Sequence, residues 1–232
     1  IIEPEYDYIE FYQDGIFVVG IKEKKEIDEG ALPFDDTVWK YGLIDINGKV
    51  LAPPIYIYDL AKVDRMEFHE GLAAVCVNGK WGYINARGEM AIEPRFEEAQ
   101  NFQEGVAYIK EDGRYGLIDR SGSIVVKPQF TNISTKIKNG YIRVEKSNRK
   151  WGVIDKSGHI VVEPAYDYVF GDISEGMSRI QQVESFGFAN CRNGNIIAPV
   201  FNYVYEFSEG LAVVRLTEEQ LTEHSISSDR TD

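Results

Sequence analysis

Short apolar runs separated by glycine-containing turns recur along the chain, and their pattern predicts a series of small β-sheets. One copy reads Leu72–Val77, then Trp81–Ile84, then Met90–Ile92. Each run is shorter than an ordinary helix and shows little polar alternation, which favours strands that are covered on both faces. A glycine between the second and third runs suits a tight hairpin, because glycine adopts positive φ without steric cost. Each copy is therefore predicted to be an antiparallel meander of three strands, followed by a fourth, irregular strand or loop.

Fixed offsets define the repeat. Five aromatic residues are each followed by glycine, and a proline follows each of them after thirteen residues; the aromatics are Tyr41, Trp81, Tyr115, Trp151 and Phe186, and the prolines are Pro54, Pro94, Pro128, Pro164 and Pro199. A second aromatic lies two residues after each proline, at Tyr56, Phe96, Phe130, Tyr166 and Phe201. We expect the first aromatic of each copy to be buried between stacked sheets, where it anchors the repeat. The proline is expected to end the third strand, since it cannot donate to a strand ladder.

The combination of motifs resembles the WG-repeat family, also called KWG repeats, of mostly bacterial proteins. The resemblance rests on Gly71-Leu72-Ala73, Lys80-Trp81-Gly82 and Glu93-Pro94-Arg95-Phe96 and on their recurrence over residues 1–216. Tyr41, Tyr115 and Phe186 depart from the tryptophan of the motif. The resemblance implies a β-rich tandem array, and it implies no active site or cofactor.

The predicted architecture is all-β, with antiparallel meanders of ~35 residues stacked face to face over residues 1–216. A unit of this size is too small to fold alone, so neighbouring copies must cover each other's apolar faces. The array begins and ends within a repeat and holds about five and a half copies. That count favours an open β-superhelix or solenoid over a closed β-propeller, which stays as the alternative. Residues 217–232 are polar and acidic and are predicted to be a linker or disordered tail.

Two insertions interrupt the period near the start of the array. The first lies within residues 20–40 and the second within residues 61–69. One interpretation is a hairpin extension or terminal cap, and the other is a pair of partner-binding loops on a rigid scaffold. The candidate binding residues are Lys22, Lys24, Lys25, Leu32, Phe34 and Trp39 in the first insertion and Lys62, Arg65 and Met66 in the second.

Charge narrows the class of partner. Lys and Arg number 25 against 38 Asp and Glu, so the net charge is −13, and the acidic excess is expected to extend over all repeats. Binding to nucleic acid is disfavoured, because it needs clustered cations, and a basic protein partner is favoured. No apolar run is long enough to predict membrane insertion. The chain starts at Ile1, and the pattern leaves open whether it is cytoplasmic or exported.

Candidate chemistry is sparse. Cys76 and Cys191 lie at different phases of the repeat, so thiols are favoured over a disulfide framework. The three histidines lack the spacing of a metal site, and no cofactor is predicted. A polar residue recurs shortly after each aromatic-glycine pair, at Asp45, Asn85, Asp119, Asp155 and Asn190. These positions suit Asx turns better than calcium ligands, because Asn replaces Asp in two copies.

The sequence therefore predicts a non-enzymatic repeat scaffold that mediates protein–protein interaction. The alternative is a module that binds carbohydrate or cell wall through exposed aromatics, and it requires the aromatics after the prolines to be accessible. A hydrolytic enzyme would require two carboxylates that face each other across a cleft, and no motif predicts one.

Overall fold

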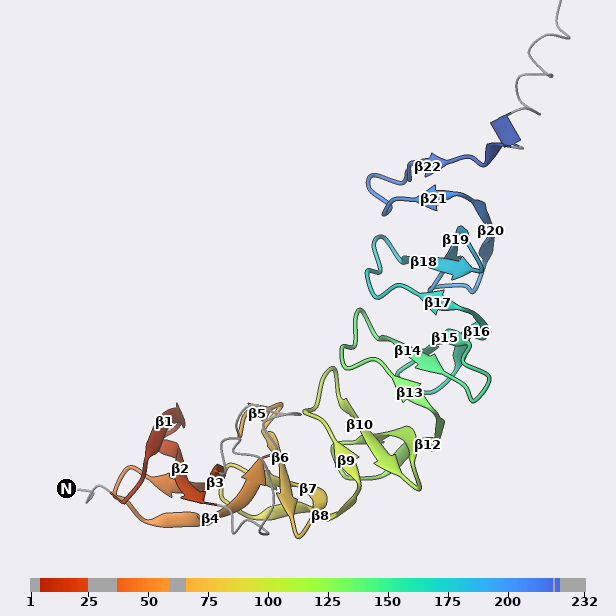
Figure 1. Ribbon diagram of the computed structural model, residues 1–232. Helices are drawn as coiled ribbons and strands as arrows, with labels where there is room; N and C mark the ends of the chain where they lie inside the picture. The colour runs from red at the N-terminus through yellow and green to blue at the C-terminus, as the bar shows by residue number, and fades with distance from the viewer. Residues whose placement is uncertain (1–4, 25–36, 59–65, 219, 222–232) are drawn as a thin grey trace, which may run out of the picture. The chain divides into compact units, whose positions relative to one another are not determined.

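A computed structural model describes residues 5–24, 37–58, 66–218, 220 and 221. The chain divides into two compact units, Ile1–Ile124 and Val125–Asp232. Antiparallel strands make up nearly all of the regular secondary structure among the described residues (Figure 1), and none of the described sheets closes on itself. The predicted all-β class is confirmed, and the repeats fit a solenoid-like fold of successive small sheets.

The first unit holds one eight-stranded sheet and most of a second sheet. The strands of the larger sheet are β1 (Tyr8–Gln13), β2 (Ile16–Lys24), β3 (Thr37–Asp45), β4 (Val50–Tyr58), β6 (Leu72–Val77), β7 (Lys80–Asn85) and β8 (Met90–Phe96), and β5 (Phe68–His69) pairs with β6. The strands of the second sheet are β9 (Glu98–Ala99), β10 (Val106–Glu111) and β11 (Arg114–Asp119). Strand β12 (Ile124–Phe130) then continues into the second unit.

The second unit repeats the same order of strands. One sheet contains β13 (Asn132–Ile133), β14 (Tyr141–Glu145), β15 (Trp151–Asp155) and β16 (Ile160–Tyr166), and the next contains β17 (Tyr168–Val169), β18 (Met177–Gln182), β19 (Ser185–Asn190) and β20 (Ile196–Phe201). A two-stranded sheet of β21 (Tyr203–Val204) and β22 (Val214–Arg215) follows. Thr217 and Gln220 then cap a helical turn. The Thr217 N–H donates to the Gln220 side-chain oxygen at 3.0 Å, and the Gln220 N–H donates to the Thr217 hydroxyl oxygen at 3.3 Å.

The glycine after each aromatic gives the chain room for a bulge that carries the proline. In β15 and β16, Trp151 lies opposite Tyr166 and Val153 opposite Val162, so β16 holds two extra residues opposite Gly152. A Cβ on Gly152 would lie 2.4 Å from the Val162 carbonyl oxygen. The prediction that proline ends the third strand is therefore wrong. The strand passes through the proline to the next aromatic, because the bulge removes the need for its missing N–H.

In four copies the strand register places the aromatic that precedes glycine directly opposite the aromatic that follows the proline. These pairs are Tyr41↔Tyr56, Trp81↔Phe96, Trp151↔Tyr166 and Phe186↔Phe201. Burial of the anchors was predicted correctly for Tyr41 and Trp81, which are both 5% exposed. Tyr115, Trp151 and Phe186 are only half-buried. Cationic side chains lie over two of these rings, Lys110 over Tyr115 and Arg143 over Trp151.

A type I′ turn recurs before the first long strand of each copy. Its first residue has φ between 48° and 55° and its second, a glycine, has φ between 76° and 87°, at Asp14-Gly15, Glu70-Gly71, Glu104-Gly105, Asn139-Gly140, Glu175-Gly176 and Glu209-Gly210. Glutamate is an unusual residue at positive φ. Its carboxylate links successive copies, because Glu70 accepts from Gly105 N–H at 3.0 Å and Glu175 accepts from Gly210 N–H at 2.9 Å. These hydrogen bonds help to align the repeats within each unit.

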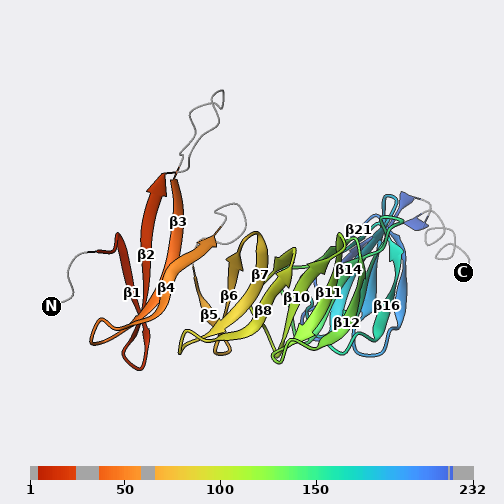
Figure 2. The ribbon, with the colours of Figure 1, turned by 90° about the horizontal axis from the view of Figure 1, so that it is seen from below.

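The first two copies depart from separate face-to-face sheets. Ile57 of β4 pairs with Cys76 of β6, which joins both copies in one sheet. The first insertion lengthens a hairpin, since the β2–β3 register continues through Lys22↔Trp39, Glu23↔Val38 and Lys24↔Thr37. Figure 2 shows these two strands reaching beyond their neighbours. The described residues on either side of the insertion therefore extend the hairpin of β2 and β3.

Candidate functional site

The predicted Asx turns are present at the recurring polar position. One side-chain oxygen accepts N–H bonds from residues two and four positions later in Asp45, Asn85, Asp119 and Asp155, over 2.8–3.1 Å. A hydrogen bond from Ser121 is the largest influence that lowers the pKa of Asp119. These side-chain oxygens serve the turns. Cys76 and Cys191 are thiols, and burial raises the pKa of Cys191 to about 11.

The predicted partner-binding residues have different surroundings. Lys25, Leu32, Phe34, Lys62 and Arg65 lie outside the described residues. Lys22 is exposed, and its backbone N–H donates to Asp7 at 2.7 Å. Lys24 is the last residue of β2, and Trp39 is half-buried, with its ring stacked 6.1 Å from Tyr41. Met66 is 2% exposed and belongs to the core, so its assignment to the surface of a loop is corrected.

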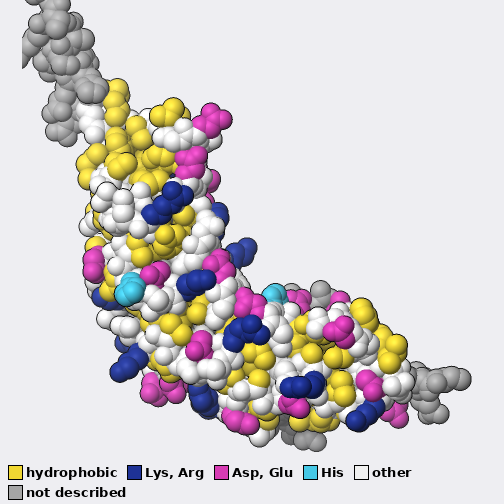
Figure 3. All heavy atoms as spheres, turned by 180° about the vertical axis from the view of Figure 1, so that it is seen from behind, with side chains coloured by type: hydrophobic (Ala, Val, Ile, Leu, Met, Phe, Trp, Pro, Cys, Tyr) yellow, Lys and Arg dark blue, Asp and Glu magenta, His cyan; other side chains and the backbone are white. Residues whose placement is uncertain are grey.

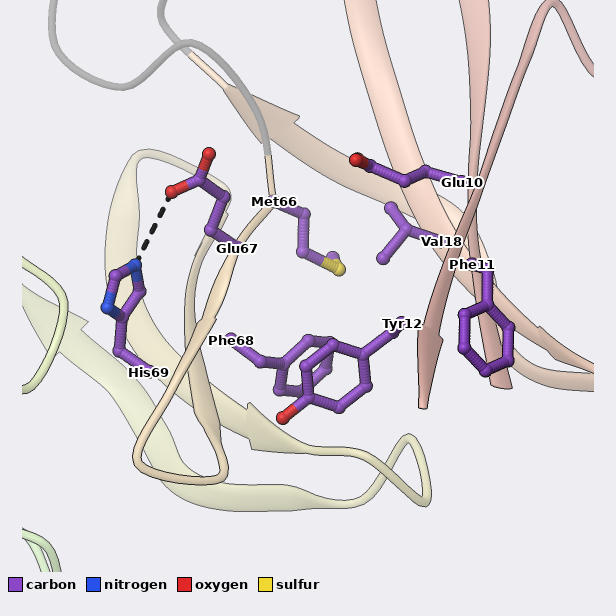
Figure 4. Close-up of a pocket in the computed structure, with 8 residues that line it drawn as sticks. All are labelled: Glu10, Phe11, Tyr12, Val18, Met66, Glu67, Phe68 and His69. Atoms are coloured by element: carbon purple, nitrogen blue, oxygen red, sulfur yellow. Dashed lines mark hydrogen bonds and ion pairs between the residues drawn. The ribbon is translucent and has the colours of Figure 1, made fainter. Parts of the chain in front are cut away.

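A pocket in the first unit lies next to Met66. It has a volume of about 320 Å³ and is lined by Glu10, Phe11, Tyr12, Val18, Met66, Glu67, Phe68 and His69. Figure 4 shows the Tyr12 and Phe68 rings together at one end, and their centroids are 4.4 Å apart. Glu10 and Glu67 lie toward the other end. The pocket therefore joins an apolar surface to two carboxylates.

A β-bulge helps to form this pocket. The register of β1 and β2 passes from Phe11↔Phe17 to Gln13↔Ile16, so Tyr12 has no partner residue on β2. Bulges re-aim side chains, and here Phe11 and Tyr12 both line the pocket although they are neighbours in sequence. Phe11 is 60% exposed. Its ring therefore offers an exposed apolar surface at the pocket.

Hydrogen bonds hold the acidic groups of the pocket. Glu10 accepts from the hydroxyl of Tyr8, and Glu67 lies 3.4 Å from His69 Nε2. Burial, reinforced by the charge of Asp14, raises the pKa of Tyr12. Of the residues that line the pocket, the sequence identified only Met66 as a candidate. It missed Glu10 and Phe11, because a short edge strand with a bulge leaves no periodic signal.

A second cluster of side chains lies in the second unit. Aromatic rings follow one another with centroids 4.9–6.2 Å apart, in the order Trp151, Tyr168, Phe170, Phe186, Tyr203 and Tyr205, which we call the aromatic row. Arg143 lies over Tyr168 and Arg179 lies over Phe170. Tyr168, Tyr203 and Tyr205 are 38–51% exposed. The exposed aromatics are thus different residues from those that the sequence suggested.

The aromatics after the prolines do not form an open platform. Tyr56, Phe96 and Phe130 are at most 5% exposed, while Tyr166 and Phe201 are half-buried. Each packs across from the first aromatic of its own copy wherever the register is defined. They are structural residues rather than a sugar-stacking surface.

Arg179 lies between two carboxyl groups of the second unit. It pairs with Asp172, and its Nη2 lies 3.9 Å from Glu206. Burial opposes the charge of Asp172, but a hydrogen bond from Glu206 and the guanidinium of Arg179 together lower the pKa of Asp172. The hydrogen bond with Asp172 and the charge of that group raise the pKa of Glu206. Asp172 and Glu206 therefore share one arginine, and each influences the pKa of the other.

Charge on the visible surface is mixed. Figure 3 shows Lys and Arg side chains among Asp and Glu, with hydrophobic side chains between them. Among the described residues, no group of three or more His, Cys, Asp and Glu side chains could hold a metal ion. No described helix has the length and apolar character needed to cross a membrane.

The repeat geometry agrees with a family comparison. The profile of the WG containing repeat matches residues 1–24, 41–81, 81–115, 115–149, 151–182 and 186–218. The chain belongs to the WG-repeat family. The resemblance noted in the sequence is thereby confirmed, and the chain is a β-repeat scaffold.

Other comparisons give this WG-repeat chain no function. A search of curated proteins found no match. Among solved structures, it resembles the designed protein Ika8 (14% identity, 90% of this chain and 80% of that one, TM-score 0.42) and BamB from Moraxella catarrhalis (12% identity, 79% and 57%, TM-score 0.39). It also resembles the WD40 β-propeller domain of Doa1 (12% identity, 86% and 71%, TM-score 0.33). Likenesses of this extent assign neither a partner nor an activity.

Proposed function

We propose that this WG-repeat chain is a non-enzymatic scaffold whose first unit binds a protein segment that presents an apolar side chain next to Lys or Arg. The observation that carries the proposal is the pocket beside Met66, with its apolar end at Tyr12 and Phe68 and its acidic end at Glu10 and Glu67. A partner with this chemistry fits both ends at once. The net charge of −13 would also favour its approach over long range.

The size and exposure of the pocket support a peptide ligand. A volume of about 320 Å³ admits one or two side chains rather than a folded domain. Phe11 lines the pocket and is exposed, so a bound peptide would contact its ring. Edge strand β1 also offers backbone groups to an extended segment, as in binding by strand addition.

Selection of random displayed peptides on the immobilised chain tests this proposal. We expect the selected peptides to share an apolar residue adjacent to Lys or Arg. By calorimetry, Phe11→Ala and Glu67→Gln should each weaken the best peptide by about tenfold, since apolar anchors and charge pairs at the centre of an interface often contribute 1.4 kcal/mol or more.

Matched variants separate the pocket from the general surface. Ile9→Ala alters another exposed apolar residue of β1, and Glu93→Gln removes another exposed carboxylate of the same unit. Both should change affinity by less than about twofold. Equal losses in the pocket variants and these controls, or selected peptides without the shared pair of residues, would contradict the proposal.

A second candidate function is carbohydrate binding at the aromatic row. The exposure of Tyr168, Tyr203 and Tyr205 favours it, since exposed rings can stack on sugar faces. A glycan array probed with the native chain and with Tyr205→Ala tests it. Binding that disappears in the variant supports this candidate, and an array without signal rejects it.

A further inference from the structure

The acidic excess expected in every repeat is absent from one of them. Between Lys127 and Lys150 the chain holds seven basic residues and a single acidic one, Glu145. The basic residues are Lys127, Lys136, Lys138, Arg143, Lys146, Arg149 and Lys150. The expectation was wrong because it averaged charge over copies that share a backbone pattern but not their surface residues. A dense group of cations in an acidic chain creates a local site for an anion.

Three of these cations line one hollow in the second unit. The hollow has a volume of about 230 Å³ and is lined by Ser134, Thr135, Lys136, Lys138, Tyr141, Arg143, Gly171 and Ile173. Among the described residues, no ion pair joins Lys136, Lys138 or Arg143 to a carboxylate. Glu206 interacts with Lys138 at longer range while it hydrogen-bonds to Asp172. The hollow therefore collects positive charge without a carboxylate partner of its own.

Arg143 is held ready to bind. One terminal nitrogen, Nη1, donates to the Val169 carbonyl at 2.9 Å, and the guanidinium lies 5.8 Å from the ring centroids of both Trp151 and Tyr168. The other terminal nitrogen, Nη2, lies beside Gly171, where an added Cβ would be 3.1 Å away. The absence of a side chain at Gly171 leaves space next to Nη2. Because the guanidinium is already ordered, little conformational entropy would be lost on binding.

The next copy shows which group complements this arrangement. Lys136 and Asp172 occupy equivalent positions in the two copies, because an isoleucine follows each of them directly. An arginine follows each of them after seven residues, Arg143 in one copy and Arg179 in the next. In that next copy, the carboxylate of Asp172 pairs with Arg179. Lys136 stands at the equivalent position in the hollow, so the arginine there lacks the carboxylate that its counterpart has. An external anion would supply the missing oxygens.

We propose that this hollow binds an anionic group with two or more terminal oxygens, either a carboxylate or a phosphate monoester. Lys136 and Lys138 would supply charge at the rim, and Arg143 would donate from Nη2. Thr135 and Tyr141 line the same hollow. This site is separate from the pocket of the first unit, so either proposal can fail without the other.

Titration of the full chain at low salt tests the site. Inorganic phosphate, phosphoserine and glutamate are added separately, and amide shifts are followed by NMR. We expect shifts at residues 134–143 and 171–173 with a Kd of about 1 mM or tighter for at least one probe. Stronger binding of phosphate and phosphoserine would identify a phosphate site, and stronger binding of glutamate a carboxylate site.

A matched pair of double variants decides between a site and general attraction. Lys136→Gln with Lys138→Gln should weaken binding by about tenfold or more, since each removes a charge-assisted contact. Lys127→Gln with Arg149→Gln removes the same charge from exposed positions of the same repeat outside the hollow. It should weaken binding by less than about twofold at moderate salt. Equal losses in the two double variants, or no shifts with any probe at about 10 mM, would overturn the proposal.

Discussion

Replacing Gly82 with alanine tests why an aromatic-glycine pair and a distant proline recur together. The added Cβ would lie 2.5 Å from the Ile92 carbonyl oxygen and 2.7 Å from the Pro94 nitrogen. Ordinary contacts begin at 3.4 Å, so the bulge would have to retreat by about 0.9 Å, the difference between 3.4 and 2.5 Å. Both contacted atoms belong to the backbone, and no change of rotamer can relieve the clash. Gly82→Ala should therefore shift the strand that carries Pro94.

The clash itself is expected to cost about 3 kcal/mol. Overpacking usually costs 1–3 kcal/mol, and contact between backbone atoms places this site at the upper end. Alanine also has less conformational freedom than glycine in the unfolded chain, and this offsets about 0.4–1 kcal/mol of the loss. We therefore expect a net decrease of about 2–3 kcal/mol in the free energy of unfolding. Urea denaturation followed by circular dichroism measures it, and an unchanged m-value shows that the same transition is compared.

Gly79→Ala is the matched control. Gly79 has φ of +75°, and nothing lies within 4 Å of an added Cβ, so this substitution costs backbone strain without a clash. That strain is about 1–2 kcal/mol. If Gly82→Ala destabilises the chain no more than Gly79→Ala, the close approach of the bulge is not what requires glycine after the aromatic.

Three further predictions concern polar groups. Glu175→Ala removes the 2.9 Å bond to Gly210 N–H, so hydrogen exchange at Gly210 should accelerate by about tenfold, and unchanged exchange would refute this link between copies. The free energy of unfolding of Asp119→Asn should stay within about 0.5 kcal/mol of that of the native chain, while Asp119→Ala should lose about 1 kcal/mol. Because the pKa of Asp119 is lowered in the folded chain, the native chain should lose stability as pH falls through that pKa, and neither variant should show this loss in urea titrations. Because the pKa of Glu206 is raised in the folded chain, protonated Glu206 contributes stability in acid, and this contribution is lost as pH rises through that pKa. Carbon-detected NMR should show that the pKa of Glu206 is lower in Asp172→Asn than in the native chain.

The repeated elements could be predicted because each has a local cause. Glycine at fixed places, apolar runs of strand length and a recurring Asx residue such as Asp119 all act within one copy. The proline bulge was misjudged for the opposite reason. Pro94 alone indicates the end of a strand, and only its position opposite Gly82 in a neighbouring strand shows that the chain can continue through it.

The pockets could not be predicted, because they depend on how side chains from different copies pack against one another. Tyr12 and Phe68 meet at 4.4 Å although a whole copy of the repeat separates them. The bulge that turns Tyr12 toward Phe68 is visible only in the register of β1 and β2. Met66 was chosen as part of an inserted loop, yet it lies at the inner end of that segment and is buried.

One position shows how the same backbone can serve different purposes in successive copies. The third residue after the turn glycine is Ala74, Tyr108, Arg143 and Arg179 in four consecutive repeats. Ala74 is buried in the core, burial raises the pKa of Tyr108 to about 12, and the two arginines lie over aromatic rings. The glycine and proline positions do not vary in this way, because a Cβ or a lost bulge would disturb the backbone itself. Residues that differ between copies at equal backbone positions are therefore free to carry binding specificity, and in the second unit they converge on the hollow beside Arg143.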